Sequence, residues 1–163
     1  MKKIYHLFLI LVLALFSSSN VNAQSGGSTK YKCMVQMTNY MGEGAYIVVS
    51  LIDPKGAYEK TLYVMGSDKK WYRDLKEWHK FYAKKATNLS AISGASVSGG
   101  DRSVVFLDIE NSKINSGYSL RFESAVEDQA YHVKDLEFQL TTENVAGKND
   151  GTGFIRYVRL TPN

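Results

Sequence analysis

Residues 45–52, with the sequence AYIVVSLI, decide the fold class. This run is dense in β-branched and aromatic side chains, and it is too apolar to face water on both sides, so we predict a central β-strand. The next residues, Asp53-Pro54-Lys55-Gly56, predict a turn, because proline fixes φ at the second position and glycine supplies the freedom needed to leave it. Residues 58–65 (YEKTLYVM) return as the partner strand of a hairpin.

Five further runs have the composition of strands and are separated by turn-forming residues: 31–38, 103–109, 118–126, 131–141 and 153–161. About seven strands at this spacing predict a mainly β fold, an antiparallel β-sandwich, with a β-barrel as the alternative. We expect a single domain over residues 31–163, preceded by a flexible segment at 24–30.

One amphipathic helix is predicted between the third and fourth strands, over residues 69–85. Its apolar side chains recur at helical spacing, and its lysines and arginines fill the other positions, as on a solvated face. The apolar positions are Trp71, Leu75, Trp78 and Tyr82. Ser67 or Asp68 would cap the start of the helix.

The first 23 residues have the pattern of a signal peptide. Two lysines precede an apolar run over residues 4–16, and Val21-Asn22-Ala23 resembles the cleavage site of signal peptidase. The run is shorter than the roughly 20 apolar residues of a membrane-spanning helix. We therefore predict cleavage near Ala23 and a soluble periplasmic or secreted protein with no later transmembrane segment.

The composition excludes several classes of function. Loss of Lys2 and Lys3 with the signal peptide lowers the formal net charge from +4 to +2, which gives no reason to expect a nucleic-acid partner. Cys33 is the one cysteine, so no disulfide can form within the chain, and its apolar neighbours predict a buried strand position. His79 and His132 do not form a metal-binding pattern, and no catalytic constellation stands out, so we predict neither a metal site nor an enzyme.

Two features could bind a ligand. Trp71 and Trp78 most simply pack the helix onto the sheet, but a flat ligand could stack on a tryptophan at the edge of the helix. The second feature is the stretch Ser93-Gly94-Ala95-Ser96, whose small residues permit a tight loop and a close approach of the backbone.

Three segments resemble, in the same order, the predicted periplasmic proteins of domain-of-unknown-function family 2271. The first, residues 71–78, has the form W-x-x-D-L-x-x-W, the second is the loop at 93–96, and the third, residues 117–125, has the form G-x-Y-x-L-x-x-E-x-A. Some relatives are likened to the immunoglobulin-like domain of flagellar hook-capping proteins, which implies an immunoglobulin-like sandwich. That likeness concerns the fold and implies no flagellar function.

The resemblance also implies an association with extracytoplasmic electron transfer, through PepSY-type membrane reductases and flavin transferases. Flavin transferases attach FMN to the last residue of the pattern D-x-x-[ST]-G-A-T. Ser96 occupies that position here, after Ser93, Gly94 and Ala95, while Ser90 stands where the pattern has aspartate.

Three hypotheses about function follow. The first is a non-enzymatic accessory or binding module of the cell envelope, in a flavin-linked redox system with a PepSY-type membrane protein. The second is an electron carrier with FMN attached covalently to Ser96. The third is a purely structural immunoglobulin-like module for adhesion or assembly.

Overall fold

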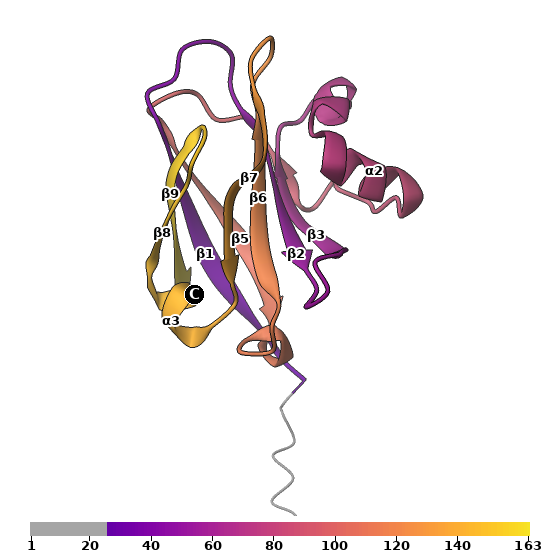
Figure 1. The fold of residues 1–163 in the computed structure, drawn as a ribbon, viewed down its shortest axis with the longest axis vertical. Helices are drawn as coiled ribbons and strands as arrows, with labels where there is room; N and C mark the ends of the chain where they lie inside the picture. Colours follow the sequence, from indigo (N-terminus) through magenta and orange to yellow (C-terminus); the bar gives the residue numbers. More distant parts are fainter. Residues whose placement is uncertain (1–25) are drawn as a thin grey trace, which may run out of the picture.

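The computed structural model describes residues 26–163, and the predicted signal peptide lies outside this range. Nine strands form two layers, and a few short helices lie outside or between the strands along the chain (Figure 1). The strands are β1 (Ser28–Met37), β2 (Tyr46–Ile52), β3 (Tyr58–Met65), β4 (Ser93–Gly94), β5 (Arg102–Glu110), β6 (Ser119–Ala125), β7 (Tyr131–Gln139), β8 (Lys148–Asp150) and β9 (Ile155–Pro162). The helices are η1 (Lys69–Asp74), α2 (Lys76–Lys84), η2 (Asn111–Lys113) and α3 (Thr142–Ala146).

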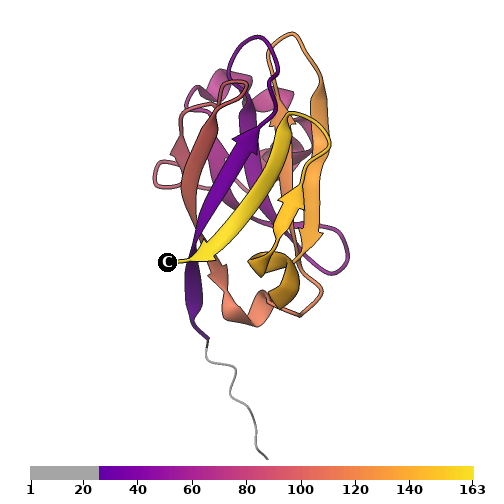
Figure 2. The same ribbon diagram turned by 90° about the vertical axis from the view of Figure 1, so that its left-hand side faces the viewer.

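The two layers are β-sheets, so the predicted mainly β sandwich is confirmed. One sheet has the order β5-β1-β9-β8 and faces the viewer in Figure 2, and the other has the order β4-β3-β2-β6-β7. All seven predicted strands are present, and β4 and β8 are two short additions. Apart from the parallel pairing of β3 with β4, the pairs are antiparallel. Strand β1 begins at Ser28, inside the segment predicted to be flexible.

Strand β2 is central in its sheet and buried on both faces. Ile47, Val49 and Leu51 belong to the main core between the sheets, to which Cys33 of β1 also belongs. Val48 belongs to a second core on the opposite face, beneath η1 and α2, together with Leu75 and Trp78. Two covered faces explain why the sequence of β2 does not alternate between apolar and polar residues.

The predicted single helix over residues 69–85 is wrong in one respect, because it is divided into η1 and α2. Asp68 caps η1 as predicted, and its side chain accepts the N–H of Lys70. The division falls at Leu75, which is fully buried with a non-helical backbone (φ −82°, ψ 65°). Side chains of the sheet accept hydrogen bonds from backbone N–H groups in the first turn of α2, so α2 begins as a separate helix.

Among residues 26–163, no helix combines the length and the apolar character needed to cross a membrane.

Candidate functional site

A pocket of about 150 Å³ lies where η1, the segment after β4 and the end of β6 meet. Nine residues line it, and they come from four separate parts of the chain: Glu43, Gly44, Tyr46, Trp71, Asp74, Ser96, Ala125, Val126 and Glu127. The structure therefore brings together Trp71 and Ser96, which the sequence singled out for unrelated reasons.

Helix η1 presents Trp71 and Asp74 to the pocket. Gly66 directly follows the end of β3 and leads the chain towards η1, and its φ is +142°. A Cβ at that glycine would overlap the ring of Tyr46, so the close approach requires the missing side chain. Tyr72 is the buried residue of η1, and its hydroxyl donates to the carbonyl oxygen of Gly66 at 3.0 Å. This bond fixes the helix relative to the end of β3.

The loop that carries Ser96 is held on both sides by backbone hydrogen bonds. On one side, Gly66 N–H donates to the carbonyl oxygen of Gly94 at 2.7 Å. On the other side, Ala45 and Val97 exchange two bonds, of 2.8 and 3.1 Å. Between these supports the Ser96 side chain is exposed and lies against Gly44, where a Cβ would come within 2.6 Å of the serine Oγ. The backbone next to Ser96 is thus held in place by the β-bridge between Ala45 and Val97.

The pocket is acidic. Three of its lining residues are carboxylates, Glu43, Asp74 and Glu127, and none of them takes part in an ion pair within residues 26–163. Lys70 lies over the Trp71 ring, with its Nζ 5.0 Å from the centre of the ring, and it also pairs with Asp68 at 3.2 Å. The lining itself contains no basic residue, so a positively charged group would be attracted to it.

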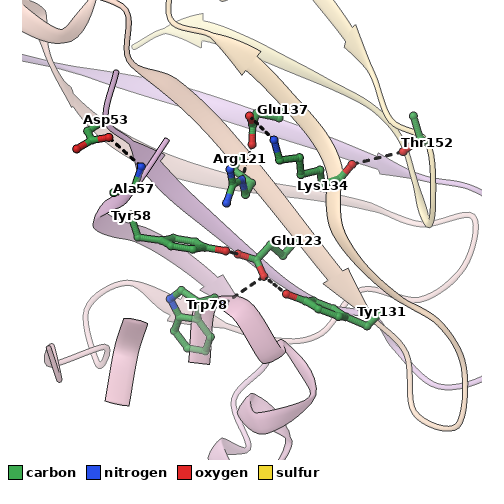
Figure 3. A network of polar contacts seen from close by, with 10 residues as sticks. All are labelled: Asp53, Ala57, Tyr58, Trp78, Arg121, Glu123, Tyr131, Lys134, Glu137 and Thr152. Carbon is green, nitrogen blue, oxygen red and sulfur yellow. Dashed lines mark hydrogen bonds and ion pairs between the residues drawn. The ribbon is translucent and has the colours of Figure 1, made fainter. Parts of the chain in front are cut away.

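Glu123 of β6 holds α2 against the sheet (Figure 3). Its carboxylate is fully buried and accepts hydrogen bonds from the hydroxyls of Tyr58 and Tyr131 and from the backbone N–H of Trp78. The Tyr131 hydroxyl in turn accepts the N–H of Glu77 at 2.9 Å. These two N–H groups belong to the first turn of α2, where no preceding helical carbonyl can satisfy them, so the sheet itself caps the helix.

Burial is the largest cause of the pKa shifts of Glu123, Tyr58 and Tyr131. Desolvation raises the pKa of Glu123, although the bonds from Tyr131, Tyr58 and Trp78 oppose the shift. Burial, followed by the bond to Glu123, also raises the pKa of both tyrosines. Next to the network, burial alone would raise the pKa of Glu137, but the bonds from Arg121 and Lys134 outweigh it and lower that pKa.

A second buried carboxylate, Asp135, joins the two sheets at another edge. It accepts the N–H groups of Thr152, Gly153 and Ile155 and the hydroxyl of Ser124. The bond from Gly153 is 2.7 Å long and that from Ile155 is 2.9 Å. These donors satisfy both oxygens of the carboxylate, so the role that this geometry supports is structural.

The other predicted site residues lie close to the pocket or beneath it. Ser93 and Gly94 form β4, and Ala95 is exposed between Gly94 and Ser96. Trp78 is fully buried, with Tyr82 stacked on it at 5.0 Å and its indole N–H donating to Thr61 at 2.8 Å. This packing leaves no face of the Trp78 ring for a ligand.

Sequence reasoning missed most of the acidic lining. Glu43 and Glu127 lie in connections between strands, and nothing in their local sequence indicates that these connections meet. The sequence gives one indirect indication of the role of Glu123. A carboxylate inside the strand SLRFESA must accept hydrogen bonds if it is buried. Within residues 26–163, no three His, Cys, Asp or Glu side chains are grouped closely enough to hold a metal ion.

Comparison with protein families gives one match. The model of the family described as "Predicted periplasmic protein (DUF2271)" matches residues 28–157, which is most of the chain. The chain belongs to this family. Membership in DUF2271 agrees with the predicted location outside the cytoplasm. No curated protein and no solved structure matches the chain.

Two of the segments that resemble DUF2271 proteins lie in contact in the structure. The segment at 71–78 and the segment at 117–125 meet where Glu123 accepts the N–H of Trp78, at 3.3 Å. The first segment also supplies Trp71 and Asp74 to the pocket, and the second ends at Ala125 in its lining. The Glu123 contact therefore positions one wall of the pocket relative to another.

Proposed function

We propose that this protein is a non-enzymatic binding module of the cell envelope, and that its pocket receives a positively charged side chain of a partner protein. The observation that carries the proposal is that Trp71 lies in one small pocket with three carboxylates that have no cationic partner among residues 26–163. A guanidinium group can stack on an indole ring while it donates hydrogen bonds to carboxylates, which is the chemistry this lining offers.

The size of the pocket favours a single side chain over a whole cofactor. Pockets that enclose a drug-sized ligand have volumes of roughly 300–1,000 Å³. The pocket beside Trp71 has about 150 Å³. An arginine or lysine of a membrane partner, such as the PepSY-type reductase suggested by the family resemblance, is the occupant that this volume and charge support.

Amides of single amino acids test the chemistry of the pocket directly. We expect N-acetyl-arginine amide to shift the indole N–H resonance of Trp71 in a nitrogen-15 NMR titration, while the neutral isostere N-acetyl-citrulline amide has little effect. The indole N–H of Trp78, which is bonded to Thr61, is the internal control. Equal responses to the two amides, or no response to either, would contradict the proposal.

The partner itself is tested by co-purification with the PepSY-type protein from native membranes. Asp74→Asn and Trp71→Ala are expected to abolish the association. Glu143→Gln, which removes an exposed carboxylate from α3, is the matched control and should leave it intact. An association that survives both pocket variants would show that the pocket does not make the contact.

A covalent FMN carrier is the second candidate, because the Ser96 side chain is exposed beside Trp71. The pocket does not fit a flavin well, since its volume is small and its three carboxylates oppose the negative charge of a phosphodiester. Intact mass and visible absorbance decide the question on protein produced with its flavin transferase. A yellow protein with the added mass of one FMN, lost in Ser96→Ala, would establish the carrier, and a colourless protein at its peptide mass would exclude it.

A further inference from the structure

Strand β5 differs from the other sheet edges of the described chain. The two sheets have four edge strands, β5, β8, β4 and β7. Strands β8 and β4 are only three and two residues long. Strand β7 is longer, but the chain after β8 bonds to it at Asp135, whose carbonyl oxygen accepts the N–H of Thr152 at 2.7 Å, and its pairing with β6 shifts register between Phe122 and Ser124. Short, irregular or partly covered edges are protected against pairing with another chain.

The edge at β5 has none of these protections. It is nine residues long, contains no proline, and pairs with β1 without a shift of register. In Figure 2 it forms the free margin of the front sheet, beside β1. Two large apolar side chains lie on its solvent-facing side: Val104 has 45% and Phe106 has 48% of its surface exposed. A long and regular edge that exposes apolar side chains at its centre is a template for strand addition.

The hydrogen bonds at the two ends of the β1–β5 pair show which backbone groups of β5 are free. Met37 N–H donates to Asp101, and Asn111 N–H donates to Gly27. Bonded pairs alternate along an antiparallel ladder, so the odd-numbered residues of β5 face β1. The N–H and C=O groups of the even-numbered residues, from Arg102 to Glu110, therefore point away from the sheet.

The side chains of these even-numbered residues are complementary to a second copy of the same strand. When two β5 strands run antiparallel about a two-fold axis at Val105, Arg102 stands opposite Asp108 of the other copy. In the same register Val104 stands opposite Phe106. The symmetry makes each contact twice, and neither Arg102 nor Asp108 has an ion-pair partner within residues 26–163. Directly opposite residues have Cβ atoms roughly 4.5–5.5 Å apart, close enough for both kinds of contact.

We propose that the protein forms a symmetric dimer by antiparallel pairing of β5 with β5 of a second copy. The two four-stranded sheets then join into one continuous sheet across the axis. The contact is isologous, because the same residues contribute on both sides, so it closes at two copies.

Charge exchange gives a sharp test of the register. In Arg102→Asp and in Asp108→Arg, two like-charge pairs replace two opposite-charge pairs, so each variant alone should dimerise at least about tenfold more weakly. A mixture of the two variants restores both opposite-charge pairs, so it should form a heterodimer with close to wild-type affinity. Analytical ultracentrifugation of protein purified from the periplasm measures each of these states.

Apolar substitutions provide the matched control. Phe106→Lys is expected to give a monomer, whereas Met41→Lys places the same charge at another exposed apolar position and should leave the dimer intact. Unchanged circular dichroism would show that the variants are folded. A wild-type protein that remains monomeric at all concentrations, a dimer that tolerates Phe106→Lys, or a mixture that fails to recover would each overturn the proposal.

Discussion

Glu123 and Trp78 are 45 residues apart in the chain, yet the buried carboxylate of Glu123 accepts the backbone N–H of Trp78 at 3.3 Å. Tyr58 and Tyr131 donate their hydroxyls to the same carboxylate. One side chain of the sheet therefore satisfies three donors and fixes where α2 begins. Because helix η1 and its residues Trp71 and Asp74 directly precede α2, the pocket depends on this contact as well.

Replacement of Glu123 by leucine should destabilise the fold strongly. The substitution leaves two hydroxyls and one N–H buried without an acceptor, and each such group costs about 1–3 kcal/mol. Since the tyrosines can turn to other partners, we expect a total loss of about 3 kcal/mol in the free energy of unfolding, measured with urea. Tyr58→Phe removes a single donor and should cost about 1 kcal/mol. Equal effects of the two substitutions would contradict the central role of the carboxylate.

Stability should depend on pH in opposite ways at two glutamates. The pKa of Glu137 in the folded protein lies below its ordinary value of 4.5, so its contribution is present above that value and is lost as the pH falls through the lowered pKa. The pKa of Glu123 is raised, so the folded protein gains stability as the pH falls from that raised pKa towards 4.5.

These signs can be checked with single amide variants. Urea unfolding at a series of pH values should show that Glu137→Gln loses less stability than the wild type on acidification below pH 4.5. Glu123→Gln should lack the gain that the wild type shows on the approach to pH 4.5 from above. If both variants followed the wild-type curve in parallel, neither glutamate would be the source of the dependence.

Gly66 should tolerate alanine much less well than Gly56 does. Both glycines have a positive φ, +142° at Gly66 and +84° at Gly56, but only the first lies against a side chain, the ring of Tyr46. Gly56→Ala should therefore cost only the backbone strain, about 1 kcal/mol. Gly66→Ala adds a steric overlap and should cost about 3 kcal/mol or more. Thermal unfolding of both variants measures the difference, and similar losses would contradict the close packing of Tyr46 under η1.

The two tryptophans should differ in their accessibility to solvent. Trp78 is fully buried under Tyr82, whereas Trp71 is partly exposed at the pocket. Acrylamide, a neutral quencher that the acidic lining does not repel, should quench the fluorescence of Trp71 and leave that of Trp78 largely intact, so Trp71→Phe should show weak quenching and a blue-shifted emission. Strong quenching in Trp71→Phe would mean that helix α2 opens in solution.

The strands could be predicted from the sequence because their signals are local. Apolar runs such as that of β2, and turns such as that at residues 54–56, can be recognised from a few neighbouring residues. Signals of this kind predict all seven longer strands. The division of the helix at Leu75 could not be predicted, since its cause is a carboxylate on a distant strand. The candidate site was predictable only in part. Trp71 and Ser96 were recognisable as unusual, but the acidic lining arises from connections that the topology alone brings together.

The pairing of the first strand with the last has a consequence for export. Strand β1 lies between β5 and β9, and the N–H of Asn163 at the end of the chain donates to Lys30 at 2.9 Å. A chain of which β9 has not yet been made has no neighbour for one side of β1, so the front sheet is incomplete until residues 155–162 are available. Until then β1 has an unpaired side, and an unpaired strand is the extended form that a translocation channel can accept.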